Sequence, residues 1–260
     1  KMKKLLLLAA SLCILCQQQA GAWGRLGHQV VIKVAERHLT DKAKRNIARY
    51  MPYDLKTDAV WMDHHRRDKG IDYTTAWHVY NVDENHEYNP NARLKQGDAI
   101  RALQIADYNL ARYRELNDST VVMNLRMLLH FVGDMHCPTH SYFPGPRCFW
   151  ECTLNGKPQK SFHSVYDKMP ELIYGEMSAE EVAERIDTCK RREIKKIQSG
   201  SLYDWVRDCA DNNAVIYRWN PVNTETLDPN TVELSHELVD IQMRNAGYRL
   251  AYLLNEYFGE

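Results

Sequence analysis

The sequence predicts an all-α protein with a single compact multi-helix domain, on three observations. Apolar residues recur at three- and four-residue spacing rather than in strict alternation, which is typical of amphipathic helices. The 260 residues include only 12 Gly and 9 Pro, and no Asn-Gly turn joins two alternating segments. No repeat or low-complexity linker divides the sequence into parts.

Seven segments carry an apolar stripe, and several open with a Ser, Thr or Asp that can cap the first turn. They are residues 28–40, 41–51, 97–116, 119–136, 178–197, 202–219 and 231–258. Residues 83–95, 141–160 and 219–231 are predicted to be irregular. The segment 141–160 is long for a loop in a compact domain, and such loops are often functional.

Residues 1–22 have the pattern of a secretory signal peptide. Lys3 and Lys4 precede an apolar stretch of residues 5–15, and Ala20-Gly21-Ala22 supplies a small-residue cleavage site. No stretch approaches the roughly 18 uninterrupted apolar residues that a transmembrane helix needs. We therefore expect cleavage after residue 22 to release residues 23–260 as one domain, either secreted or retained in a periplasm.

The cysteines allow two further interpretations. Cys13 and Cys16 offer a lipoprotein alternative, although each follows a leucine where a small residue is usual. An odd number of cysteines remains after cleavage, so at least one should stay free or pair between chains. Cys148 and Cys152 could close a small disulfide loop, and the sequence does not decide whether they do. The five that remain are Cys137, Cys148, Cys152, Cys189 and Cys209.

The charge balance excludes a protein that binds nucleic acid through a strongly basic surface. The chain has 34 basic and 34 acidic residues, so its formal net charge is zero and no basic patch is evident. A protein that handles phosphate without excess Lys or Arg needs positive charge from another source. Bound metal is the obvious one.

Two histidine and aspartate pairs suggest a metal site. His130 and Asp134, in "HFVGDMHCPTH", lie four residues apart, so on a helix both project from one face. His163 and Asp167, in "SFHSVYD", repeat this spacing. One such pair is usually an ordinary surface contact, but two pairs this close in sequence favour a metal. His140 follows Pro138, which should end or kink the helix, and therefore projects in a separate direction.

The ligand types favour catalytic zinc over a closed structural zinc site. They mix histidine and carboxylate, and no Cys-x-x-Cys motif is present. Asp63 and His78 could extend the set. Cleavage before Trp23 would add a free α-amino group, whose pKa of about 7.7 to 8.0 lets it lose a proton and bind metal. The amine and carbonyl of Trp23 could then chelate a metal together with His28.

These residues, taken in order, resemble the secreted trinuclear-zinc nucleases, the single-strand nuclease and 3'-nucleotidase family of the zinc phospholipase C and nuclease superfamily. The resemblance covers residues 23–167 by motif and implies an all-α fold with three Zn²⁺. One zinc would be bound by Asp63, His78, His130 and Asp134. A second would be bound by Trp23, His28 and Asp134, and the third by His140, His163 and Asp167.

The resemblance also implies the chemistry. Two close zinc ions would share a hydroxide aimed at phosphorus, and the third would neutralise the leaving 3'-oxygen. Asp63 and Arg66 are expected to act in catalysis, with Arg66 facing the scissile phosphate. His136 is not a ligand in the family and is expected to be structural. The expected substrates are single-stranded DNA or RNA and 3'-nucleotides, and no obligate protein partner is evident.

The chain departs from the family where a base would bind. The residue after His78 is commonly aromatic, but here it is Val79. We expect Tyr80 and Asn81 to contact substrate, and Tyr80 or an aromatic residue of the following loop to stack on the base. The loop candidates are Tyr142, Phe143 and Trp150. Cys137 replaces a usual Gln, and "PGPRCFWECTLNG" replaces a Gly-Gly-Asn segment, so the wall of the cleft differs.

Two other functions compete with the nuclease interpretation. A zinc phospholipase C shares the N-terminal Trp, but typically spaces the first His further from it and ends the third site with Glu rather than Asp167. A non-catalytic zinc-binding relative would explain Val79 and the altered loop. Activity on phosphatidylcholine alone would indicate the first alternative, and inactivity of the fully zinc-loaded protein would indicate the second.

Overall fold

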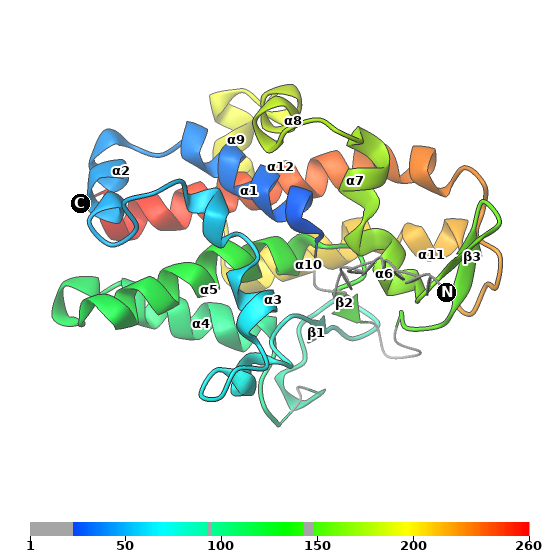
Figure 1. The fold of residues 1–260 in the computed structure, drawn as a ribbon, viewed down its shortest axis with the longest axis horizontal. Coiled ribbons are helices and arrows are strands. Elements are labelled where there is room, and N and C mark those ends of the chain that lie inside the picture. Colours follow the sequence, from blue (N-terminus) through cyan, green and yellow to red (C-terminus); the bar gives the residue numbers. More distant parts are fainter. Residues whose placement is uncertain (1–22, 93–94, 143–147, 260) are drawn as a thin grey trace, which may run out of the picture.

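The longest helix, α12 (Thr231–Phe258), is the central element of the computed structural model, which describes residues 23–92, 95–142 and 148–259 (Figure 1). The helices α1 (Arg25–Arg37), α2 (Asp41–Ala48) and α5 (Asp118–His136) pack against it, and α4 (Ala99–Leu110) lies along α5. This arrangement confirms the all-α prediction.

The predicted caps explain where several helices begin. The Thr40 hydroxyl accepts a hydrogen bond from the amide of Ala43 and caps α2, and Asp98 caps α4 in the same way through Arg101. Ser178 and Glu181 form a reciprocal capping box at the start of α8 (Ala179–Ile186). A similar box opens α10 (Leu202–Asn213).

Two predicted helices are each divided in the structure. Residues 178–197 form α8 and α9 (Arg191–Gln198), and residues 202–219 form α10 and α11 (Ile216–Trp219). The first break occurs at Asp187, whose carboxylate accepts hydrogen bonds from Arg37 Nε at 2.6 Å and from the Tyr248 hydroxyl at 2.8 Å. Because these partners are on α1 and α12, the break depends on tertiary contacts that the local sequence pattern does not show.

Short elements fill the segments without a clear periodicity. They are α3 (Trp61–His65), α6 (Phe162–Asp167), α7 (Met169–Tyr174) and the 3₁₀ turns η1 (Leu55–Asp58), η2 (Asp72–Thr74), η3 (Pro90–Ala92) and η4 (Tyr113–Glu115). Two pairs of short strands complete the described chain: β1 (Tyr80–Asn81) is parallel to β2 (Ser141–Tyr142), and β3 (Cys152–Leu154) is antiparallel to β4 (Lys157–Gln159).

The β1 and β2 pair joins two of the predicted ligand segments. The amide of Tyr80 donates to the carbonyl of His140 at 3.0 Å, and the His140 Nδ1 lies 2.5 Å from the carbonyl of His78. The residues that follow His78 and those that follow His140 are therefore held side by side, although they are far apart in sequence.

Some predictions concern residues that the structure does not describe or pairings that it does not contain. The predicted signal peptide and Phe143 lie outside the described residues. Within the described chain, neither Cys148 nor Cys152 forms a disulfide bond, and the other three cysteines are also free thiols. None of the helices described here has the length and apolar composition needed to cross a membrane.

Candidate metal centre and active site

Asp134, on the last turn of α5, lies at the centre of the predicted ligands and is completely buried. Its Oδ2 is 3.0 Å from Nδ1 of His78 and 3.3 Å from Nε2 of His130. Its Oδ1 is 3.3 Å from Nε2 of His28. The two oxygens of one carboxylate thus face two different groups of donors.

The first group contains Asp63, His78, His130 and Asp134. The Oδ1 of Asp63 is 3.5 Å from the His78 Nδ1 and 3.9 Å from the His130 Nε2. The two histidine nitrogens are 3.1 Å apart. Ligands at zinc–nitrogen distances of about 2.0 to 2.1 Å in a tetrahedron are separated by about 3.3 Å, so these four donors fit one zinc ion.

The second group forms where α1 crosses α5. The ring of His28 stacks on that of His130 with centroids 4.1 Å apart. Gly133 permits this approach, because a Cβ at that position would lie 2.7 Å from the His28 Nδ1. Both His28 nitrogens are buried without a hydrogen-bond partner, an arrangement that is costly unless another group binds them.

The third group combines the turn after α5 with α6. The His140 Nε2 and the His163 Nε2 each lie 3.5 Å from the Oδ1 of Asp167. The two rings stack with centroids 4.7 Å apart. His163 and Asp167 are on one face of α6, as their spacing predicts. The His140 Nδ1 is also 3.9 Å from the Oδ1 of Asp134, so the third group adjoins the other two.

Backbone carbonyls orient three of the histidine rings. The Nδ1 of His130 is 2.9 Å from the Ala59 carbonyl, that of His140 is close to the His78 carbonyl, and that of His163 is 3.3 Å from the Thr139 carbonyl. Donation of each Nδ1–H to these oxygens leaves Nε2 as the lone-pair nitrogen directed at the carboxylates. This is the usual outer support of a metal-binding histidine.

Burial dominates the electrostatics of the third group. It raises the pKa of Asp167 well above its ordinary value, and the charges of Asp63 and Asp134 add to this effect. It also lowers the pKa of His140 to about 4, and lowers that of His163 well below 6.5. These three side chains would therefore be neutral without a nearby cation.

Around Asp134, which the first two donor groups share, neighbouring charges outweigh the effect of burial on the pKa values. Burial disfavours the charged form of His130, but Asp134 and Asp63 outweigh it and raise the pKa of His130 to about 9. Burial likewise opposes ionisation of Asp134, but the charge of His130 and the nearby ring nitrogens of His130, His28 and His78 lower its pKa well below 3.8. Positive charge is thus already favoured beside Asp134.

Unsatisfied buried atoms provide an independent test of whether metal fits here. Among the described residues, the Nε2 of His140, the Oδ1 of Asp134 and both oxygens of Asp167 are buried without a hydrogen-bond partner. Native proteins contain few such groups, and each one calls for an explanation such as an ion. The geometry and the donor types both fit zinc.

The start of α1 places Trp23 beside the third group. The amide of Gly24 donates to the carbonyl of Asp167, and the amide of Leu26 donates to the Glu171 Oε1 at 3.0 Å. A Cβ on Gly24 would lie 2.9 Å from the backbone oxygen of Asp167, so the close approach of the two chain segments favours glycine here. The Trp23 side chain is fully buried.

Arg66 lies at the end of α3, on the same side as Asp63. Its Nη1 is 3.5 Å from the Asp63 Oδ1, and its side chain is 15% exposed. The guanidinium is therefore fixed at the edge of the first donor group while part of it can still be reached from solvent.

The predicted substrate contact through the Tyr80 ring is wrong. The side chain is buried, and its hydroxyl donates to the Met135 carbonyl at 2.9 Å, so no face of the ring is open to a base. Asn81, the second residue of β1, is partly exposed. Trp150 is half-buried and stacks on Phe162 with centroids 4.6 Å apart. The side chain of Tyr142 lies outside what the structure describes.

Phe149 is an aromatic residue that the sequence prediction missed. It is 53% exposed, and its ring lies against that of His163 with centroids 4.8 Å apart and an interplanar angle of 40°. An exposed ring beside a candidate metal ligand can serve as a stacking surface. Its place in a long loop was the available signal, but the sequence alone did not distinguish it from the neighbouring aromatic residues.

His136 agrees with its predicted structural role. Its Nδ1 is 2.8 Å from the Val132 carbonyl, and its Nε2 is 2.9 Å from Nη1 of the buried Arg249. Burial and the charge of Arg249 lower the pKa of His136 well below 6.5. The ring is thus a neutral link between α5 and α12.

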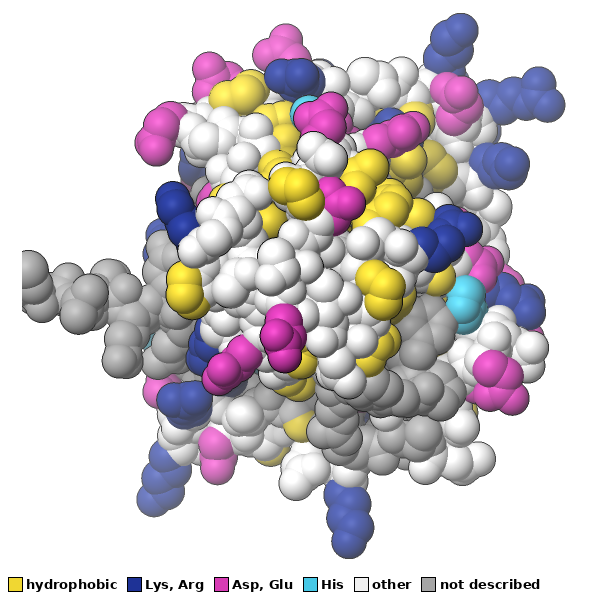
Figure 2. All heavy atoms as spheres, turned by 90° about the vertical axis from the view of Figure 1, so that its right-hand side faces the viewer, with side chains coloured by type: hydrophobic (Ala, Val, Ile, Leu, Met, Phe, Trp, Pro, Cys, Tyr) yellow, Lys and Arg dark blue, Asp and Glu magenta, His cyan; other side chains and the backbone are white. Residues whose placement is uncertain are grey.

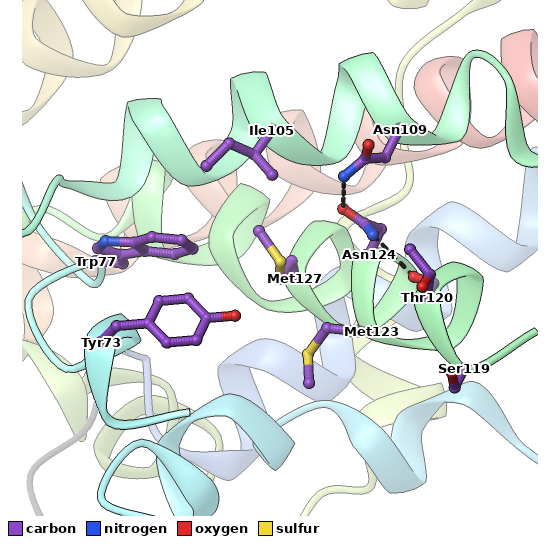
Figure 3. Close-up of a pocket in the computed structure, with 9 residues that line it drawn as sticks. All are labelled: Tyr73, Trp77, Ile105, Asn109, Ser119, Thr120, Met123, Asn124 and Met127. Carbon is purple, nitrogen blue, oxygen red and sulfur yellow. Dashed lines mark hydrogen bonds between the residues drawn. The ribbon is translucent and has the colours of Figure 1, made fainter. Parts of the chain in front are cut away.

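A separate cavity of about 390 Å³ lies between α4, α5 and the segment before His78 (Figure 3). Tyr73 and Trp77 line one end, and an Asn109–Asn124 hydrogen bond of 3.0 Å lies at the other. Its lining contains no ionisable group of the predicted metal centre. On the face drawn in Figure 2, Lys and Arg side chains are scattered mainly around the rim, so the described residues of this face form no continuous basic patch.

Fold and site together define a helical protein whose buried histidine and carboxylate donors could hold metal, the kind of centre that metal-dependent phosphoesterases use. The chain belongs to the S1/P1 nuclease family, since the family model described as S1/P1 Nuclease matches residues 23–259. It is therefore a hydrolase, and it belongs to a family of zinc-dependent single-strand nucleases. This match favours the nuclease over the phospholipase C interpretation.

Individual relatives agree with the family assignment. Nuclease P1 of Penicillium citrinum is 23% identical over 273 residues, which cover 91% of this chain and 98% of that protein. Endonuclease 2 of Arabidopsis thaliana is 27% identical over 132 residues, 45% of each chain. Nuclease S1 of Aspergillus oryzae is 24% identical over 148 residues, covering 54% of this chain and 50% of that protein.

Proposed function

We propose that the processed chain binds three Zn²⁺ and hydrolyses both single-stranded DNA or RNA and the phosphomonoester of 3'-nucleotides. The observation that carries this proposal is the convergence of three buried donor groups around Asp134. It is supported by donor separations that fit zinc and by buried donor atoms that have no other partner.

One zinc would be bound by Asp63, His78, His130 and Asp134, and a second by the amine and carbonyl of Trp23 with His28 and Asp134. The third would be bound by His140, His163 and Asp167. When bound, zinc acts as a Lewis acid toward phosphoryl oxygens and lowers the pKa of water toward about 7. The three ions would also supply the positive charge that the overall composition lacks.

The protein's own groups would position the phosphate. The Arg66 guanidinium would donate to a phosphoryl oxygen and stabilise the negative charge that develops in the transition state. Asp63 orients that guanidinium through its Oδ1 while contributing to the first donor group. Burial of the surrounding donors excludes bulk water, which strengthens each of these electrostatic contacts.

Substrate recognition would involve Phe149 and Asn81. A base whose phosphate lies at the third donor group could stack on the exposed Phe149 ring, which would replace the aromatic residue absent at Val79. Asn81, partly exposed on β1, would contribute a polar contact. Both lie on segments joined to metal-binding histidines: Phe149 through its ring contact with His163, and Asn81 through β1.

We also propose that residues 1–22 are removed on export to a periplasm or the extracellular medium. The hydrogen bond from the Gly24 amide to the Asp167 carbonyl supports this, because it fixes residue 23 beside the candidate centre. The family match, which begins at residue 23, also supports it. Processing would convert an amide nitrogen, which does not bind zinc, into an amine that can.

The function is tested by assaying the zinc-loaded processed protein on single-stranded DNA, single-stranded RNA, 3'-AMP, 5'-AMP and phosphatidylcholine. We expect hydrolysis of the first three, with activity lost in a chelator and restored by zinc. Turnover of phosphatidylcholine without nucleic acid would contradict the substrate class. No turnover of any substrate at full zinc occupancy would favour a non-catalytic relative.

A further inference from the structure

Cys137 occupies the turn that connects two metal-binding segments. It is the C-cap residue of α5, and Pro138 prevents the helix from continuing. The amide of His140 donates to the Cys137 carbonyl at 3.0 Å, which closes the turn. The sequence Cys-Pro-Thr-His thus has the short spacing that lets two side chains chelate one zinc ion.

The position of the thiol agrees with this spacing. The Cys137 Sγ, a ring nitrogen of His140 and a carboxylate oxygen of Asp167 all lie within 4.8 Å of one another, and all three residues are buried. The Sγ is 3.9 Å from the Thr139 hydroxyl, a weak contact that would not compete with a metal–sulfur bond.

The neighbouring donors independently indicate a cation at the same place. The Nε2 of His140 and both Asp167 oxygens are buried without a hydrogen-bond partner in the described structure. These atoms are more than nine-tenths buried, and the distance of 3.5 Å between the His140 Nε2 and the Asp167 Oδ1 suits two ligands of one ion.

We propose that Cys137 supplies a sulfur ligand to the metal of the third donor group. On binding, the Sγ–H bond breaks, a metal–sulfur bond of about 2.3 Å forms, and the proton leaves to solvent. The inference rests on the proposed function only in requiring a metal at His140, His163 and Asp167. A thiolate would favour soft, thiophilic ions such as zinc over Mg²⁺ or Ca²⁺ at this site.

Cobalt substitution tests the proposal without relying on activity. The processed protein is loaded with Co²⁺, and the near-ultraviolet spectrum is examined for thiolate-to-cobalt charge transfer. We expect the band in the wild-type protein and in the matched control Cys209→Ser, another buried cysteine, but not in Cys137→Ser. The same variant should bind the metal of the third donor group at least about 10-fold less tightly, since even outer-shell partners of a metal ligand contribute that much.

A measurement on the wild-type protein covers the case in which Cys137→Ser does not fold. Cadmium-113 NMR should show one resonance shifted strongly downfield, as sulfur ligation requires, beside resonances of nitrogen and oxygen sites. Absence of both the cobalt band and the downfield resonance overturns the proposal, as does a band that persists in a folded Cys137→Ser protein.

Nuclease assays on the same zinc-loaded preparation separate this proposal from the proposed function. A thiolate band without nuclease activity would contradict the function and leave the sulfur ligand supported. Nuclease activity without the band would contradict the sulfur ligand alone.

Discussion

His28 and Asp134 face each other across the contact between α1 and α5, with the His28 Nε2 3.3 Å from the Asp134 Oδ1. Because the other oxygen of Asp134 faces His78 and His130, this carboxylate is shared between two donor groups. A shared carboxylate is the feature expected where two metal ions lie close together.

Asp134→Asn should remove zinc from both groups that share the carboxylate. The amide is neutral and has one oxygen in place of two, so it cannot replace a bridging ligand. We expect zinc content to fall and nuclease activity to drop at least about 100-fold. Elemental analysis and kcat/KM on single-stranded DNA measure these effects. Asp68→Asn, at a surface residue whose side chain is 57% exposed, is the control. Full zinc content in Asp134→Asn would contradict the shared role.

Arg66→Ala should lower kcat about 100- to 1000-fold, the effect of losing one donor to a developing oxyanion. Zinc content should stay unchanged, because Arg66 contacts Asp63 without binding metal itself. Arg67→Ala, at the exposed neighbour, should behave as wild type. If Arg66→Ala retained full kcat, Arg66 would have no part in catalysis.

Phe149→Ala should raise the KM for single-stranded substrates while leaving kcat nearly unchanged, because stacking on an exposed ring contributes mainly to binding. A loss of about 1 kcal/mol corresponds to a roughly 5-fold change. Phe149→Tyr should retain wild-type KM. Tyr108→Ala, which removes an exposed ring on α4, provides the control. Equal KM values for Phe149→Ala and wild type would exclude Phe149 as a base platform.

One extra residue before Trp23 in the processed protein should block the α-amino group and sharply lower activity. The helical circular dichroism spectrum should not change, because the addition alters no core residue. Intact-protein mass spectrometry before and after denaturation should show one zinc fewer than in the wild type. A residue added after Glu260 is the matched control. Undiminished activity and zinc content would remove Trp23 from the centre.

Asp187 should stabilise the fold in a pH-dependent manner. Burial opposes its ionisation, but hydrogen bonds from Arg37, His38 and Tyr248 outweigh this and lower its pKa below 3.8. A lowered folded-state pKa gives stability that is present above about pH 4 and lost as the pH falls through the folded-state value. Asp187→Asn should therefore melt a few degrees lower at pH 7, by about 2 to 4 °C per kcal/mol lost.

Thermal melts of wild type and Asp187→Asn across pH 3 to 7 check this sign. The two melting temperatures should converge toward the acidic end. A difference that stayed constant down to pH 3 would mean that charge on Asp187 is not the source of its contribution.

The helices and the paired donors were predictable because they depend on local periodicity. His130 with Asp134, and His163 with Asp167, have the four-residue spacing that places two side chains on one helical face. By contrast, the split at Asp187 depends on partners from α1 and α12, which no local pattern shows. Tyr80 was predicted wrongly because the sequence does not show which face of the short strand β1 is buried.

Long-range contacts decide the rest of the site. The pairing of β1 with β2 brings His78 to His140, and the tilted contact of the Phe149 ring with His163 depends on the path of a long loop. The proximity of Cys137 to Asp167 arises only when α6 packs beside the end of α5. The resemblance to a known family suggested the candidate metal ligands, but these chain-specific contacts required the structure.

The proposed trinuclear centre is tested most directly by mass spectrometry of the processed protein, first in its native state and then denatured. We expect a chain that begins at Trp23 and carries three zinc ions in the native spectrum, all of them lost on denaturation. A chain that begins elsewhere, or a native protein with one zinc ion or none, would contradict the proposed trinuclear centre.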